Sequence, residues 1–181
     1  MKIKTKTRAI ILTVLILFTA SCASQKKLTS EEIKKVYMQD IYTALTNEIS
    51  NDAEVEIVED SVKVIFTNGI LFKVNQNVIV DELYPCFSRF AKVLNKYVNT
   101  TILITGHTDN TGDERINIDL SQKRADSAKK LLAELEVLES RIFTLGHGSA
   151  ISIDSNSTLT GRARNRRVEF IILYNYHENK K

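Results

Sequence analysis

The sequence predicts an α+β fold in which helices cover one face of a mixed sheet, preceded by an N-terminal helix. The first observation is an alternation of apolar and polar residues over 53–66, which is the period of a strand. The second is a helical spacing of apolar residues over 81–98 and again from about residue 121. The third is that these helical stretches alternate with short apolar runs at 100–107, 141–148 and 166–176. Strands that alternate with helices in this way predict βαβ units.

The N-terminal helix is expected to begin with Ser30 as its N-cap and to run for about 20 residues. Its apolar residues recur at helical spacing and form a narrow stripe. That stripe favours packing on the domain over a free stalk, and its narrowness argues against a helix lying on a membrane surface. The strand pair that follows is predicted to turn at Glu59 and Asp60. Pro85 lies near the first turn of the next helix, where proline is tolerated.

The first 21 residues are predicted to be a signal peptide. A basic start precedes the apolar run Ala9 to Ala20, which is shorter than the ~20 residues of a spanning helix but suits a signal-peptide core. Removing the four positive charges of this segment from the formal net charge of +3 leaves −1. A nearly neutral mature chain argues against nucleic-acid binding, which needs a basic stripe. The four basic residues are Lys2, Lys4, Lys6 and Arg8.

Cys22 is the expected site of lipidation. The small residues before it resemble a bacterial lipobox, at which the chain is cut and the cysteine acylated. Thr19 stands where the lipobox usually has Leu, so an ordinary signal peptide with an incidental cysteine is the alternative. Residues 22–28 then form the lipidated Cys and a short tether that reaches ~20 Å at most. Cys86 is expected to be a buried thiol, and no intramolecular disulfide is expected.

Asp109 and Arg124 form the candidate site. Asp109 lies just past the predicted strand 100–107, where α/β sheets commonly bind ligands, and a glycine-bearing turn follows it. We expect an irregular helical turn over 113–119 and then a helix capped by Ser121, which places Arg124 in the first turn of that helix. A cation there opposes the helix dipole, so a specific role is expected. That role is either a salt bridge to Asp109 or a bidentate grip on a ligand carboxylate.

Three separated motifs occur in one order along the chain: TGHTDNTG (105–112), Asn117-x-x-Leu120-Ser121-x-x-Arg124-Ala125, and GRARNRRVEF (161–170). Together they resemble the signature of the OmpA C-terminal domain family, which includes the peptidoglycan-associated lipoproteins. The resemblance covers about residues 61–175 and implies a βαβαβ two-layer sandwich, in agreement with the patterns above. It also implies non-catalytic binding of peptidoglycan, anchored on the diaminopimelate of the stem peptide, with no cofactor.

By this resemblance, Asp109 meets the ammonium group of diaminopimelate and Arg124 grips its carboxylate. The remaining residues expected at the pocket are Asn117, which orients the loop or the ligand, Thr108, which contributes backbone donors, and Asn165 and Arg166 of the third motif. The resemblance therefore favours a clamp for a zwitterion over a purely structural salt bridge. An ion pair in the empty site is compatible with such a clamp.

The resemblance predicts a lipoprotein on the periplasmic face of the outer membrane, tethering that membrane to the wall. Members of the family often have Phe-Asp-Ser after the first strand, whereas here Phe72 is followed by Lys73 and Val74. The usual Pro after GHG is also replaced by Ala150. The first departure keeps open an alternative, a structural subunit of a larger envelope complex with weak or lost wall binding. The expected divisions are 1–21 signal peptide, 22–28 lipidated Cys and tether, 29–60 helix and first strand, 61–175 binding domain and 176–181 polar tail.

Three other functions are disfavoured by the sequence. A metal site built on His107, Asp109 and His147 lacks a further well-spaced ligand, and His177 lies in the polar tail. A hydrolase built on Ser121 is disfavoured because this residue is interpreted as a cap and no nucleophile elbow or phosphate loop is present. The arginine-rich run 162–167 follows a secretion signal and belongs to a nearly neutral chain, so nucleic acid is not the expected partner. Neither enzymatic activity nor a bound metal is expected.

Overall fold

The computed structural model describes residues 28–67, 71–72 and 76–175. The predictions for the signal peptide, for Cys22 and most of its tether, for Lys73 and Val74, and for the tail that contains His177 lie outside these described residues. Within the described part of the chain, no helix is both long enough and apolar enough to cross a membrane.

The sheet has five strands in the order β1-β2-β5-β3-β4. Strands β3 and β4 are parallel, and every other neighbouring pair is antiparallel. The predicted mixed sheet is therefore confirmed. The strands are β1 Glu54–Val58, β2 Ser61–Thr67, β3 Thr100–Gly106, β4 Ile142–Gly146 and β5 Arg167–Tyr174.

Helices precede the sheet and connect its strands. The parallel pair β3 and β4 is joined by the long helix α4, which makes a βαβ unit. Short 3₁₀ turns precede α3 and β4 and span Asp81–Leu83 and Glu139–Arg141. The helices are α1 Ser30–Ile49, α3 Tyr84–Lys96, α4 Glu114–Glu134 and α5 Leu159–Asn165.

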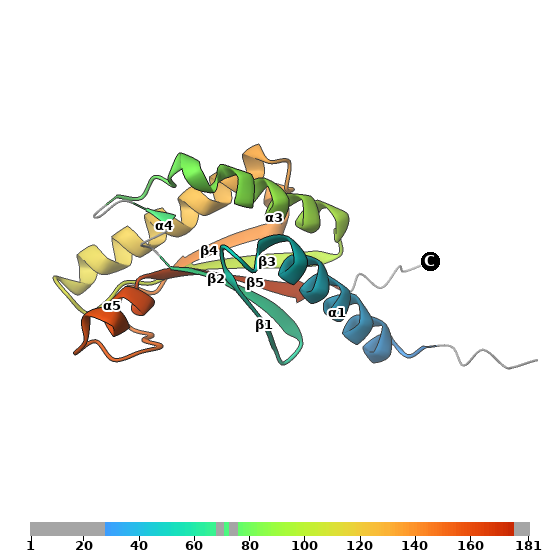
Figure 1. The fold of residues 1–181 in the computed structure, drawn as a ribbon, viewed down its shortest axis with the longest axis horizontal. Coiled ribbons are helices and arrows are strands. Elements are labelled where there is room, and N and C mark those ends of the chain that lie inside the picture. Colours follow the sequence, from blue (N-terminus) through green and yellow to red (C-terminus); the bar gives the residue numbers. More distant parts are fainter. Residues whose placement is uncertain (1–27, 68–70, 73–75, 176–181) are drawn as a thin grey trace, which may run out of the picture.

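One hydrophobic core joins the sheet to three helices. Figure 1 shows α3 and α4 lying along the same side of the sheet, and the buried side chains of α1 belong to the same core. Four aromatic rings occupy its centre, with the Phe90 and Phe170 centroids 5.1 Å apart and the Phe66 and Phe87 centroids 5.3 Å apart. Each fully buried Phe contributes about 2–3 kcal/mol through the area that it removes from water. This core fixes the strand ends that carry the candidate site.

Helix α1 packs on the domain and is not a free stalk. Its buried residues recur at helical spacing from Met38 to its C-terminal end, and they are Met38, Ile41, Leu45 and Ile49. The strand that follows α1 pairs with β2, so the predicted division between residues 60 and 61 falls inside the β1–β2 hairpin. Glu59 takes the left-handed conformation in that hairpin, with φ 52°, which agrees with the predicted turn.

The N-cap of helix α1 lies one residue before the predicted cap, Ser30. Thr29 is the N-cap, and its side chain accepts a hydrogen bond from the backbone N–H of Glu32. The Glu32 carboxylate accepts in turn from the backbone N–H of Thr29, which completes a capping box. In α3, Pro85 lies in the first turn as predicted.

Helix α4 begins earlier than the sequence predicts, and this corrects the placement of two residues. Its N-cap is Asp113, whose carboxylate accepts from the backbone N–H groups of Arg115 and Ile116. Ser121 is therefore a fully buried residue inside the helix and not its cap, and Arg124 lies about three turns from the helix start. The expected irregular turn over 113–119 was wrong because Asp113 already satisfies the free amide groups. The helix dipole consequently has little effect on Arg124.

Helix α5 was not predicted, since the sequence suggested only a polar loop before the last strand. It has seven residues, and Thr158 caps it by accepting from the backbone N–H of Gly161. Two turns are too few to show a helical period in the sequence. The helix matters for the site because it ends immediately before Arg166 and β5.

Candidate functional site

The candidate site lies at the end of the sheet where β3 ends and β5 begins. The antiparallel register pairs Gly106 with Val168, and the backbone N–H of His107 donates to Arg167 O at 2.9 Å. Asp109, which follows β3, is thereby brought next to Arg166, which precedes β5. Helix α5 and the first turns of α4 lie at this same end, at the left of Figure 1.

Asp109 is 5% exposed and its carboxylate is held on both oxygens. Its Oδ1 accepts from the backbone N–H of Thr111 at 3.0 Å and from the Thr111 hydroxyl. Its Oδ2 accepts from Arg166 Nη1 at 2.6 Å. Burial alone would raise the pKa of Asp109, but the hydrogen bonds from Thr111 and Arg166 outweigh it and lower the pKa. Asp109 is therefore a fixed carboxylate that stays ionised.

Arg124 is 4% exposed and makes no ion pair among the described residues. Its Nε donates to Gln76 O at 3.1 Å, and its guanidinium carbon lies 5.3 Å from the centre of the Phe72 ring. Burial lowers the pKa of Arg124, the nearby charge of Arg166 lowers it further, and the charge of Asp109 raises it. The salt bridge between Asp109 and Arg124, which the sequence left open as one alternative, is absent among the described residues, and Asp109 pairs with Arg166 instead. Among the described residues, no partner takes the other N–H donors of Arg124.

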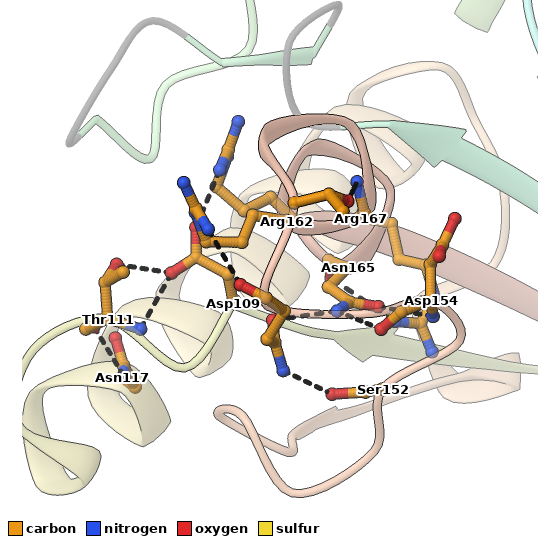
Figure 2. Close-up of polar contacts among 12 residues, drawn as sticks. Asp109, Thr111, Asn117, Ser152, Asp154, Arg162, Asn165 and Arg167 are labelled. Carbon is orange, nitrogen blue, oxygen red and sulfur yellow. Dashed lines mark hydrogen bonds and ion pairs between the residues drawn. The ribbon is translucent and has the colours of Figure 1, made fainter.

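Asn117 acts on the loop that carries Asp109. Its Nδ2 donates to Thr111 O at 3.0 Å, and Thr111 in turn donates to Asp109. Figure 2 shows these three residues joined by successive contacts. The predicted role of Asn117 in orienting the loop agrees with this arrangement. Thr111 was missed by the sequence prediction, although an Asp at the start of a turn commonly accepts from the backbone N–H two residues on, in an Asx turn.

Thr108 and Asn165 form hydrogen bonds within the protein. The backbone N–H of Thr108 donates to Gly148 O at 2.8 Å, so it is already engaged within the protein, whereas its buried hydroxyl has no partner among the described residues. Asn165 is fully buried and its amide makes four hydrogen bonds. These bonds join its Oδ1 to the N–H groups of Ile153 and Asp154, both at 2.9 Å, and its Nδ2 to Asp154 O and Asn156 Oδ1, both at 2.8 Å. Asn165 therefore holds the loop before α5, as Figure 2 shows.

Arg162 is a further cation that was not singled out from the sequence as a site residue. It lies one turn before Arg166, the C-cap of α5, whose backbone N–H donates to Arg162 O at 3.0 Å. Its Nη1 donates to Asn156 O at 2.7 Å. Only knowledge of the unpredicted helix would have related these two arginines.

The residues of the disfavoured enzyme sites are engaged elsewhere. The rings of His107 and His147 stack with centroids 5.2 Å apart, and His107 Nε2 lies 3.1 Å from Thr105 Oγ1. Within residues 28–67, 71–72 and 76–175, no group of three or more His, Cys, Asp and Glu side chains is arranged to hold a metal ion. Ser121 Oγ donates to Ile118 O and accepts from the backbone N–H of Gly148, both at 2.9 Å, inside the protein.

Part of this chain is similar in sequence to two curated proteins. The probable lipoprotein YiaD of Escherichia coli (strain K12) is 48% identical over 82 residues, which are 45% of this chain and 37% of that protein. The peptidoglycan-binding protein ArfA of Mycobacterium tuberculosis is 43% identical over 89 residues, which are 49% of this chain and 27% of that protein. The chain thus matches less than two thirds of the length of these curated relatives.

A solved structure shares both fold and sequence with the chain. The cell wall anchor of the T6SS from Pseudomonas aeruginosa aligns with a TM-score of 0.66 and 31% identity, over 74% of this chain and 96% of that one. Residues 71–166 match the model of the OmpA family, a stretch that includes Asp109, Arg124 and Arg166. Since this match covers more than half of the sequence, the chain belongs to the OmpA family.

Proposed function

We propose that this chain is a non-catalytic lipoprotein of the cell envelope that binds peptidoglycan, with the diaminopimelate of the stem peptide as the anchor. Membership of the OmpA family supports this proposal, as does the name of a relative that is itself described as peptidoglycan-binding. The covalent chemistry of the wall is left unchanged, since binding alone is proposed. The binding domain would comprise residues 61–175, with the packed helix α1 and strand β1 before it.

The observation that carries the proposal is the unpaired charge of Arg124 beside Asp109. A guanidinium that is 4% exposed and has no acidic partner among the described residues carries an electrostatic cost, which an anionic ligand group would relieve. Asp109 supplies an ionised carboxylate near this cation, so the site offers one group for an ammonium and one for a carboxylate. One end of diaminopimelate carries both.

The other residues of the site would support these two. Asn117 positions Thr111 and through it Asp109, and Asn165 positions the loop that leads into α5 and Arg166. The buried hydroxyl of Thr108 has no hydrogen-bond partner among the described residues and could therefore contact the ligand. Arg166 is the remaining residue of the site, and its guanidinium lies against Asp109.

The membrane anchor is proposed from the sequence. After removal of residues 1–21, lipid on Cys22 would hold the chain to the periplasmic face of the outer membrane, with a tether of ~20 Å before Leu28. Several lipidated copies on one polymer would gain from high effective concentration, so a modest affinity at each site suffices. In this arrangement the protein would tether the outer membrane to the peptidoglycan wall.

Co-sedimentation with purified sacculi tests the function. Residues 28–181 contain every described helix, strand and core residue and serve as the soluble protein. We expect the wild type to pellet with sacculi, and Asp109→Ala and Arg124→Ala to remain in solution while folded, because each leaves a ligand charge unpaired. Arg164→Ala is the matched control, since Arg164 pairs with Asp154 at 3.1 Å and not with Asp109.

The outcomes separate the proposal from its alternative. Pelleting of both site variants as completely as the wild type would show that Asp109 and Arg124 have a structural role only. A wild-type protein that stays in solution would reject wall binding and favour a structural subunit of a larger envelope complex. Circular dichroism of each variant shows whether a loss of binding reflects unfolding.

A further inference from the structure

The site contains three charges, and they do not balance. Asp109 contributes one negative charge, while Arg124 and Arg166 contribute one positive charge each, so the trio has a net charge of +1. Only one ion pair exists within it, between Asp109 Oδ2 and Arg166 Nη1 at 2.6 Å. The acid that is proposed to receive the ammonium group of the ligand is therefore already occupied.

The two arginines differ in how freely they can move. Arg124 is buried, and its contacts with Gln76 O and the Phe72 ring hold its guanidinium in place. The side chain of Arg166 is 40% exposed, and among the described residues its guanidinium pairs with Asp109 alone. An exposed guanidinium is rehydrated when it leaves its partner, so its departure costs little when another cation takes its place at the buried carboxylate of Asp109. Arg166 is the member of the trio that can exchange partners.

We propose that Arg166 determines the ligand specificity of the clamp: it occupies Asp109 in the empty site and gives it up only to a ligand end that carries an ammonium group and a free carboxylate together. The clamp therefore discriminates against stem peptides in which the carboxylate at the free end of diaminopimelate is a carboxamide. This inference rests on the proposed function, because it assumes that Asp109 and Arg124 hold that zwitterionic end.

The specificity follows from counting ion pairs. A zwitterionic end brings its ammonium group to Asp109 and its carboxylate to Arg124, and the displaced Arg166 can then pair with the same carboxylate. An end with only an ammonium group displaces Arg166 without offering it a new partner, and leaves it beside Arg124 with like charge. An end with only a carboxylate binds Arg124 and leaves the pair of Asp109 and Arg166 intact. Loss of the carboxylate is thus more damaging than loss of the ammonium group.

Calorimetric titration of residues 28–181 with three synthetic stem tripeptides tests this. One keeps the free end of diaminopimelate unmodified, one has its carboxylate converted to a carboxamide, and one has its amine acetylated. We expect the wild type to bind the carboxamide at least about tenfold more weakly than the unmodified peptide, and more weakly than the acetylated one. In Arg166→Gln, Asp109 is free in the empty site, so the carboxamide should bind more tightly than it does to the wild type. Arg164→Gln, which removes an arginine paired with Asp154, should leave the wild-type ratios unchanged.

The result separates this inference from the proposed function. If the wild type binds the unmodified peptide but Arg166→Gln weakens the carboxamide and unmodified peptides equally, Arg166 is a general contact and the inference is wrong. If the wild type binds none of the three, the proposed function and the inference fail together.

A second experiment needs no ligand and follows the NMR resonance of the Asp109 carboxyl group as the pH is changed. Arg166→Gln should raise the pKa of Asp109, because the hydrogen bond and charge of Arg166 help to lower it. An unchanged pKa would show that the two side chains are not paired in solution.

Discussion

The carboxylate of Asp109 and the guanidinium of Arg166 lie 2.6 Å apart although 57 residues separate them in the sequence. They meet because β3 and β5 are antiparallel neighbours, so the end of one strand adjoins the start of the other. The pair therefore depends on the order of strands in the sheet. It also leaves Arg124, the residue that the sequence most readily suggests as the partner of Asp109, with an unpaired charge among the described residues.

Asp109→Asn is predicted to reduce binding much more than stability. The amide oxygen can still accept from Thr111, and Arg166, whose side chain is 40% exposed, becomes hydrated when its partner is lost. The free energy of unfolding should therefore fall by only about 1 kcal/mol. Urea unfolding of this variant and of Asp154→Asn, which removes an ion pair to Arg164, provides the comparison. A loss of several kcal/mol in Asp109→Asn alone would assign this carboxylate a structural role.

Local patterns in the sequence were enough to predict much of the fold. The alternation over 53–66 predicted the β1–β2 hairpin, and the apolar run at 100–107 placed Asp109 just past the end of β3. Gly112 has φ 88°, as the predicted turn after Asp109 requires. These features depend on residues that are close in sequence, so periodicity and turn chemistry reveal them.

The rest of the site depends on relationships that local patterns do not contain. The partner of Asp109 follows from the adjacency of β3 and β5, which is a property of the whole sheet. Helix α4 is capped by Asp113 and not by Ser121, so Arg124 lies farther from the helix N-terminus than predicted. Helix α5 is too short to show a helical period, so the loop-anchoring role of Asn165 was not visible.

Gly106→Ala is predicted to be far more destabilising than Gly112→Ala. A Cβ atom on Gly106 would overlap the backbone carbonyl of Ser121, so α4 would have to move away from β3. Overpacking of this kind costs up to about 3 kcal/mol. Gly112 has open space around it, and its substitution carries only the conformational cost of a positive φ, about 1 kcal/mol. Urea unfolding measures both, and equal losses would show that the spacing of α4 and β3 does not require a glycine.

Asn165→Ala is predicted to loosen the loop before α5. The substitution removes the acceptor of two part-buried hydrogen bonds from the N–H groups of Ile153 and Asp154, which should cost about 2 kcal/mol. Faster hydrogen exchange at these two amides would locate the effect. Asn95→Ala, which removes one hydrogen bond to Leu135 O, is a control expected to cost about 1 kcal/mol without changing exchange in the loop. Unchanged protection in Asn165→Ala would mean that other contacts hold the loop.

Stability is predicted to fall in mild acid because of His107. Burial lowers the pKa of His107 from 6.5 to about 4, and the charge of Arg167 contributes to this shift. The folded protein thus keeps the imidazole neutral while the unfolded chain binds a proton below about pH 6.5. The stability that is present above pH 6.5 is therefore lost as the pH falls towards 4, by about 3 kcal/mol in total.

Urea unfolding of the wild type and His107→Gln across this pH range measures the effect. Glutamine does not titrate, so its curve should be flatter between pH 6.5 and 4, whatever the variant loses in absolute stability through altered packing. The slopes are compared for this reason, and not the midpoints. The pKa values of Asp109 and Glu169 are also lowered in the folded protein, so these carboxylates add a loss of stability at more acidic pH. If stability falls equally steeply with pH in His107→Gln between pH 6.5 and 4, groups other than His107 cause the acid sensitivity.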